Sequence, residues 1–228
     1  VRLRKAKNRD WEDLAAFQFN GESYLLIADC GDNDRIRKSS FLYAVVEPEM
    51  STAELPEGSS VPWNWRIKFS YIDGPRDCEG VAVDMSSQQI LLLTKRTVPP
   101  VIYTLPLVPV EDKTIHLARP VATLYGIPAP TPEDLREDPL YGRFRSQPTA
   151  MDISPNGKTI AVLTYRQPYL YLRHGNESWP ETFNRPPRAL SMPRMKQAEA
   201  ICFNSDGTSL FVTSEKRPAP LYRLDIRP

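Results

Sequence analysis

The chain has 228 residues, of which 41% are hydrophobic and 25% charged, as is ordinary for a globular domain. Lys and Arg total 29 against 28 Asp and Glu, so the net charge of +1 offers no field that would steer the chain to nucleic acid or to an acidic membrane. The longest apolar stretches, such as Val101 to Val110, are too short to cross a bilayer and are interrupted by proline. We therefore expect one domain over residues 1–228, with no nucleic acid partner and no transmembrane segment.

A short acidic phrase opens each of four repeats. Its copies start near residues 10, 77, 147 and 197, and three of them carry a glutamate at the third position: Glu12, Glu79 and Glu199. The remaining copy carries Thr149 there. Self-similarity at a period of about 40 to 50 residues usually indicates stacked supersecondary units.

After each phrase the sequence predicts a first strand, a turn, an apolar second strand and a third strand that contains a tyrosine. Turn sequences such as Asn20-Gly21 and Asp206-Gly207 favour positive φ and tight hairpins. The predicted second strands are Tyr24–Asp29, Ile90–Lys95, Ile160–Tyr165 and Leu210–Glu215; the third strands are Phe41–Val45, Val101–Leu105, Tyr169–Leu172 and Leu221–Leu224; the fourth strands are Trp63–Phe69, His116–Leu124 and, less clearly, Arg188–Met192. These antiparallel units predict an all-β β-propeller, with four blades visible and about five in the intact protein.

Two insertions and the N-terminal segment interrupt the repeat. Glu47 to Pro62 and Ile127 to Gln147 are rich in Pro, Glu and Ser and are predicted as surface loops, with at most a helical turn over Glu133 to Glu137. Residues 1–7 are predicted as a strand that either closes the ring by completing the last blade or ends an earlier blade. The second alternative is favoured, because the chain starts without Met and in mid-unit.

The three cysteines do not form a disulfide framework, and their spacing does not suit zinc. Cys30 and Cys78 are expected to lie close together at the same end of the ring. They form either a disulfide, in an oxidising compartment, or two partly buried free thiols, and we favour the thiols. Cys202 is expected in the core.

Strand alternation places the repeated glutamates at the start of the innermost strands, on one rim of a central channel. Oxygen ligands of this kind suit Ca²⁺ or Mg²⁺. Alternatively, each glutamate accepts backbone hydrogen bonds and pins one blade to the next, and Lys95 and Arg96 are available for internal pairing. The predicted metal ligands, on a rim made uneven by Thr149, are Asp10, Glu12, Asp29, Asp32, Asn33, Asp77 and Glu79.

Other site chemistries find little support. The two histidines, His116 and His174, lie outside the repeated rim, and the chain has no Gly-x-Ser-x-Gly motif. No catalytic residue is therefore predicted.

Three segments, Asp10 to Ala15, Ala28 to Asn33 and Tyr71 to Asp84, resemble a largely uncharacterised family of bacterial exported β-propellers. Met151 to Gly157 and Ala198 to Gly207 extend the resemblance over most of the chain. Members are similar to TolB-like and to phytase-like or esterase-like propellers, which implies a periplasmic or secreted location. Phytase-like propellers bind phosphate through calcium ions held by carboxylates, and the acidic rim is compatible with that.

Two functions are left open. We favour an extracytoplasmic binding or scaffold module, expected to be a monomer, whose acidic rim engages a protein, peptide or small-molecule ligand, with or without a bound divalent cation. The alternative is a calcium-dependent phosphoesterase or esterase-like hydrolase. The fold alone does not decide between them.

Overall fold

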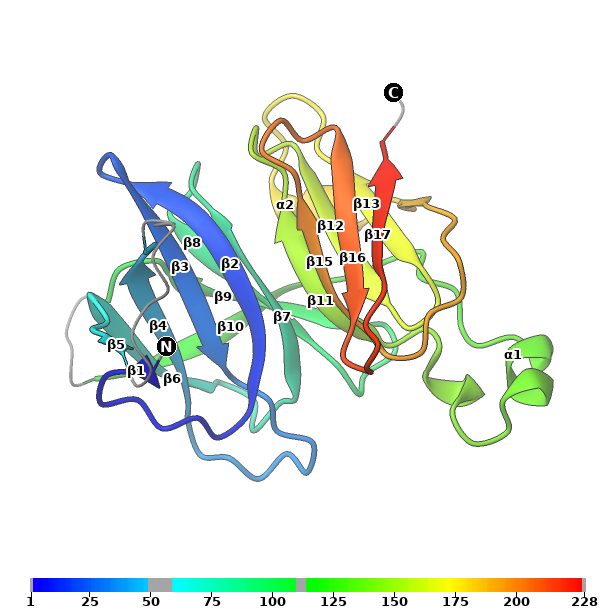
Figure 1. Ribbon diagram of the computed structural model, residues 1–228, viewed down its shortest axis with the longest axis horizontal. Helices are drawn as coiled ribbons and strands as arrows, with labels where there is room; N and C mark the ends of the chain where they lie inside the picture. The colour runs from blue at the N-terminus through cyan, green and yellow to red at the C-terminus, as the bar shows by residue number, and fades with distance from the viewer. Residues whose placement is uncertain (1, 49–58, 110–113, 227–228) are drawn as a thin grey trace.

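The computed structural model describes residues 2–48, 59–109 and 114–226, and almost all of its regular structure is β-strand. The four copies of the acidic phrase lead into β2 (Trp11–Phe19), β7 (Cys78–Asp84), β11 (Pro148–Ile153) and β15 (Ala198–Phe203). These first strands contact one another in chain order, β2 with β7, β7 with β11 and β11 with β15. Figure 1 shows the strands in two groups, with β1 to β10 in one and β11 to β17 in the other. Each phrase therefore starts the innermost strand of a blade.

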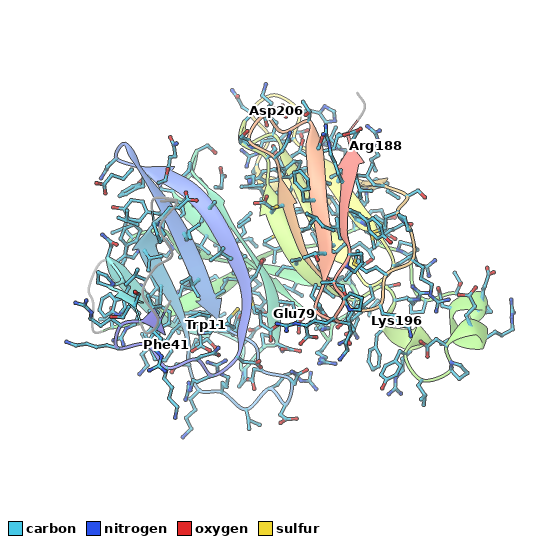
Figure 2. The ribbon with its side chains drawn as sticks, in the orientation of Figure 1. Trp11, Phe41, Glu79, Arg188, Lys196 and Asp206 are labelled. Carbon is cyan, nitrogen blue, oxygen red and sulfur yellow. The ribbon has the colours of Figure 1, made fainter. Side chains whose placement is uncertain are left out.

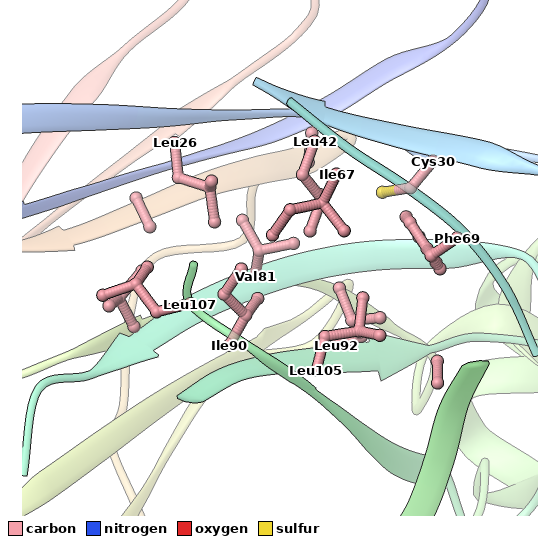
Figure 3. Close-up of a cluster of buried hydrophobic side chains, with 14 of the residues drawn as sticks. Leu26, Cys30, Leu42, Ile67, Phe69, Val81, Ile90, Leu92, Leu105 and Leu107 are labelled. Carbon is pink, nitrogen blue, oxygen red and sulfur yellow. The ribbon is translucent and has the colours of Figure 1, made fainter. Parts of the chain in front are cut away.

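Blades 1 and 2 form one continuous eight-stranded sheet. Blade 1 contains β2, β3 (Glu22–Asp29), β4 (Ser40–Val46) and β6 (Trp65–Tyr71), and blade 2 contains β7, β8 (Gln89–Thr94), β9 (Val101–Pro106) and β10 (Ile115–Thr123). Neighbouring strands within a blade are antiparallel, but β6 and β10 pair in parallel, so the two blades join at their outer edges. Alternating apolar residues such as Leu26, Ile67, Val81 and Leu92 fill the core between them (Figure 3).

Blades 3 and 4 form separate sheets. Blade 3 contains β11, β12 (Thr159–Thr164), β13 (Pro168–Leu172) and β14 (Arg188–Ala189), and blade 4 contains β15, β16 (Ser209–Ser214) and β17 (Leu221–Asp225). One apolar cluster lies between blades 2 and 3 and another between blades 3 and 4. The predicted all-β propeller is thus confirmed, and its four visible blades pack face to face. The prediction that residues 1–228 form one domain stays a prediction.

The N-terminal strand does not close the ring. β1 (Arg2–Leu3) pairs in parallel with β5 (Ser60–Val61), and Leu3 packs with Tyr43 and Val45 on the outer part of blade 1. β1 therefore does not complete the last blade, the less favoured of the two alternatives, and its packing on blade 1 buries apolar area that would otherwise face water. The favoured alternative, that residues 1–7 end an earlier blade, stays a prediction. Most of the insertion between β4 and β6 lies outside the described residues.

The second insertion contains more regular structure than predicted. α1 (Pro132–Glu137) covers the predicted turn and begins at a capping box of Thr131 and Asp134, and the 3₁₀ turn η1 (Gly142–Phe144) follows. A second short helix, α2 (Trp179–Phe183), was not predicted, although Ser178 and Glu181 form its capping box. None of the helices within the described ranges is long and apolar enough to span a membrane.

The cysteines follow the predictions in part. Cys30 and Cys78 are buried free thiols, and the Cys30 Sγ donates to the Cys78 carbonyl at 3.4 Å, which confirms that they are neighbours. Cys202 was predicted in the core but is exposed. Its side chain lies on the face of blade 4 that points away from blade 3, and no described strand packs on that face.

Candidate functional site

A buried ion pair includes Glu79, which Figure 2 labels between the two groups of strands. The Lys95 Nζ lies 2.9 Å from the Glu79 Oε2 and donates to the Tyr165 hydroxyl at 3.1 Å. Lys95 directly follows β8, and its backbone N–H donates to the Asp77 carbonyl at 2.8 Å, which fixes it beside the start of β7. The pair therefore links blade 2 to blade 3 through Tyr165.

Burial acts against both charges of this pair. It raises the pKa of Glu79 to about 7, although Lys95 opposes the change. Burial also works to lower the pKa of Lys95, but Glu79 and Tyr165 outweigh it and raise that pKa. We conclude that Lys95 stays protonated throughout the physiological range and that Glu79 is ionised above about pH 7.

Asp10 and Glu12 form a second acidic group on the backbone of Gly31. A Cβ added to Gly31 would stand 2.1 Å from the Glu12 Oε1 and 2.6 Å from the Asp10 Oδ2. The two carboxylates thus occupy the space that any other residue at position 31 would fill. Burial first, and then the charges of Glu79, Asp10 and Asp77, raise the pKa of Glu12 to about 8.

The three remaining aspartates of the predicted metal site are held by basic side chains and backbone N–H groups. Asp29 pairs with Arg37 at 3.0 Å and accepts from the Asp10 N–H at 3.0 Å. Asp32 accepts from the Arg37 N–H at 2.8 Å. Asp77 pairs with Arg96 at 2.8 Å and accepts from the Asp32 N–H at 2.9 Å. These bonds anchor the loop after β3 to blade 2.

Asn33, the predicted amide ligand, accepts a hydrogen bond from the Arg96 guanidinium. Within the described ranges, no group of three or more Asp, Glu, His or Cys side chains gathers as a set of metal ligands. The described residues therefore do not gather the seven predicted ligands into one cluster, and a bound cation stays a prediction. Five of the seven predicted ligands are paired with arginine or lysine or accept from backbone N–H groups. In the described chain, the carboxylates of the other two, Asp10 and Glu12, have no such partner.

Glu199, from the last copy of the phrase, completes the rim. Burial raises its pKa, while Lys95 and a hydrogen bond from Tyr165 oppose the change. Tyr165 was not predicted as a site residue. It follows the second strand of blade 3, just as Lys95 follows the second strand of blade 2, and this equivalence in the repeat could have identified it. The rim therefore combines Glu12, Glu79 and Glu199 with one central lysine.

Contrary to the alternative interpretation, no backbone N–H of a neighbouring blade donates to a rim glutamate among the residues that the structure describes. Two aspartates accept such bonds instead. The Asp13 Oδ2 accepts from the Val81 N–H of blade 2 at 2.8 Å and from the Met151 N–H of blade 3 at 3.4 Å. The Asp152 Oδ2 accepts from the Phe203 N–H of blade 4 at 2.7 Å. The sequence offered one signal for these two aspartates: each is an acidic residue on a strand face whose other residues are small.

A groove of about 460 Å³ opens beside the rim, between blades 1 and 4. Glu12 and Glu199 line it together with apolar residues of both blades, among them Leu14, Phe211 and Leu221. The rim and the groove thus form one continuous surface.

No family model matches the chain, and no curated protein matches it in sequence. Among solved structures, it is similar to a chain of a nidogen–laminin complex (12% identity, 89% of this chain and 57% of that chain, TM-score 0.48). It is also similar to a periplasmic gluconolactonase of Pseudomonas aeruginosa (12% identity, 94% and 57%, TM-score 0.43) and to the β-propeller domain of Cps50 (Swd1) from Myceliophteria thermophila (12% identity, 95% and 54%, TM-score 0.38). The chain spans a little over half the length of these proteins. At such identities the likeness concerns the fold alone.

Proposed function

We propose that the protein is a binding module whose rim holds a cationic group of its ligand, the basic side chain of a protein or peptide, against Asp10 and Glu12. The state of Glu12 carries the proposal. Its carboxyl group is half-buried beside other carboxylates, and within the described ranges it has neither an ion pair nor a hydrogen bond. A bound cation would stabilise the ionised form of Glu12 and lower its raised pKa.

A divalent cation is the second possible occupant of this site. Of the seven ligands predicted for calcium, Asp10 and Glu12 would bind the ion here. Ca²⁺ would need further oxygen ligands from water or from the bound partner. The predicted periplasmic or secreted location is also retained as part of the proposal.

Calorimetric titration with tetra-arginine amide, and separately with CaCl₂, tests the proposal. We expect the wild-type protein to bind tetra-arginine amide more tightly as the pH rises towards about 8, because Glu12 then ionises, and more weakly as salt is added. The Glu12→Gln variant should lose at least about tenfold in affinity. The matched variant Glu47→Gln, which removes an exposed carboxylate at the far end of blade 1, should bind like the wild type.

Two results would reject the proposal: no binding of either probe, or equal binding by the wild type and Glu12→Gln. Binding of Ca²⁺ alone, lost in Glu12→Gln, would reject the basic ligand and assign the rim to a metal ion.

One observation favours the hydrolase alternative. The pKa values of Glu12 and Glu79, about 8 and about 7, lie near neutrality, as general acid–base catalysis requires. Nitrophenyl phosphates and esters, assayed with Ca²⁺ and with a chelator, test this alternative. Turnover that falls in both Glu12→Gln and Glu79→Gln would support it, and inertness toward every substrate would remove it.

A further inference from the structure

Basic side chains gather at the end of blade 1 where β3 ends, although the chain as a whole is nearly neutral. Two segments supply them, residues 2–9 at the N-terminus and residues 33–39 in the loop after β3. The Arg9 guanidinium donates to the Ser39 carbonyl at 3.3 Å, so the two segments lie side by side (Figure 1). Together they carry one exposed carboxylate, that of Asp34, and seven exposed basic side chains, which we call the basic edge. The basic edge consists of Arg2, Arg4, Lys5, Lys7, Arg9, Arg35 and Lys38.

The fold holds the N-terminal part of the basic edge in place. The Arg2 N–H donates to the Ser59 carbonyl at 2.7 Å. The Arg4 N–H donates to the Val61 carbonyl at 2.8 Å. Leu3 is buried between them, so strand alternation turns Arg2 and Arg4 outward. Within the described ranges, none of the seven basic side chains takes part in an ion pair, and their charges are therefore available to an anionic partner.

An aliphatic side chain, Ile36, protrudes from the same loop. It is 73% exposed and stands between Arg35 and Arg37 in the chain. Hydrogen bonds fix the turn that carries it, because the Asp32 carboxylate accepts from the Ile36 N–H at 3.0 Å and from the Arg37 N–H at 2.8 Å. The Asp32 N–H donates to the Asp77 carboxylate at 2.9 Å, which ties the turn to blade 2. The loop therefore presents an apolar side chain to solvent in a fixed position beside the basic edge.

An exposed aliphatic side chain beside several basic ones suits the surface of an anionic membrane. Acidic lipid headgroups attract Lys and Arg side chains within about a Debye length, so a local group of charges acts even where the net charge is near zero. An apolar side chain gains free energy when it enters the boundary between headgroups and acyl chains. Single-stranded nucleic acid fits less well, because it is bound largely by stacking on aromatic side chains and residues 2–9 and 33–39 contain none.

We propose that the basic edge and Ile36 attach the protein to the surface of membranes that contain anionic phospholipids. The basic side chains contact the headgroups, and Ile36 inserts between them. The net charge of +1 predicted no such attraction, because it does not show how the fold distributes the charges. This inference goes beyond the proposed function and does not depend on it, since Glu12 takes no part in the contact.

Co-sedimentation with vesicles tests the proposal. The wild type should bind vesicles of phosphatidylcholine and phosphatidylglycerol in equal amounts, more weakly as NaCl is added, and should not bind vesicles of phosphatidylcholine alone. Lys7→Glu combined with Lys38→Glu should lower the partition coefficient at least about tenfold, and Ile36→Ser should lower it at least about threefold. Lys158→Glu combined with Lys196→Glu makes the same change of charge at exposed lysines in the other group of strands, and this matched control should bind like the wild type.

All the substituted side chains are exposed, so the variants should keep the melting temperature of the wild type. Equal binding of the wild type to both kinds of vesicle would overturn the proposal, as would wild-type binding by the double variant at Lys7 and Lys38 or by Ile36→Ser. Tighter binding to single-stranded DNA than to vesicles, unchanged in Ile36→Ser, would also overturn it and assign the basic edge to nucleic acid. Release from vesicles by inorganic phosphate, beyond the effect of NaCl at the same ionic strength, would instead assign it to a free phosphate group.

Discussion

Replacing Glu12 by Gln should stabilise the protein at alkaline pH. The unfolded chain loses the Glu12 proton near 4.5, whereas the folded protein retains it up to about 8. The favourable contribution of Glu12 is therefore complete below pH 4.5, falls as the pH rises and is lost above about 8. This pKa difference sets an upper limit of about 5 kcal/mol. Because Glu12 is only half-buried, solvent screening reduces the expected gain from Gln to about 2 kcal/mol.

Urea unfolding of the wild type and Glu12→Gln at about pH 4 and pH 9 measures this effect. The two proteins should be nearly equally stable at about pH 4, where the carboxyl is neutral in the folded state and mostly neutral in the unfolded state. At pH 9 the variant should be more stable, with a melting temperature higher by about 6 °C. Glu47→Gln makes the same chemical change at an exposed site and should show no such pH dependence. A Glu12→Gln variant that gains no stability at pH 9, or gains it equally at both pH values, would refute the reasoning.

Three further predictions concern the same region. Lys95→Met removes the cation beside Glu79 and should destabilise the protein by about 3–5 kcal/mol at pH 8, and by less at pH 5, where Glu79 is protonated. Urea unfolding measures this loss, with Lys158→Met at an exposed lysine as the control. An equal loss of stability at both pH values would contradict the role of Glu79. Gly31→Ala should push the carboxylates of Asp10 and Glu12 away from the backbone of residue 31 and so weaken the binding of tetra-arginine amide. The free energy of unfolding should change by about 1 kcal/mol or less. An unchanged affinity in calorimetric titration would refute this prediction. In the native protein a thiol reagent should modify Cys202 alone, because Cys202 is exposed whereas Cys30 and Cys78 are 0% exposed. Mass spectrometry measures the modification, and fast reaction of more than one thiol would show that this packing is wrong.

The repeat made the fold largely predictable. Strand alternation and a local turn code recur in each unit, and Asn20 and Gly21 both adopt the positive φ that their sequence favours. The pairing of the N-terminal strand was not predictable in this way, because Arg2 and Leu3 bond to Ser60 and Val61 through tertiary contacts that no local pattern specifies.

The sequence singled out the acidic phrase but did not reveal its chemistry. The structure pairs Glu79 of that phrase with Lys95. Acidity alone did not reveal which carboxylates are already paired, since the partners of Asp29 and Asp77 come from loops whose course depends on the folded chain. The same limit explains why Cys202 was assigned to the core: the sequence shows which face of a strand a residue occupies, but not whether another blade covers that face.

The break in the repeat at Thr149 helps to explain why the acidity of the rim is uneven. The Thr149 hydroxyl is buried and donates to the Ala198 carbonyl at 2.7 Å, so blade 3 ties itself to blade 4 where the other blades present a carboxylate. The charge is therefore concentrated on blades 1, 2 and 4, and Glu12 lines both the rim and the groove.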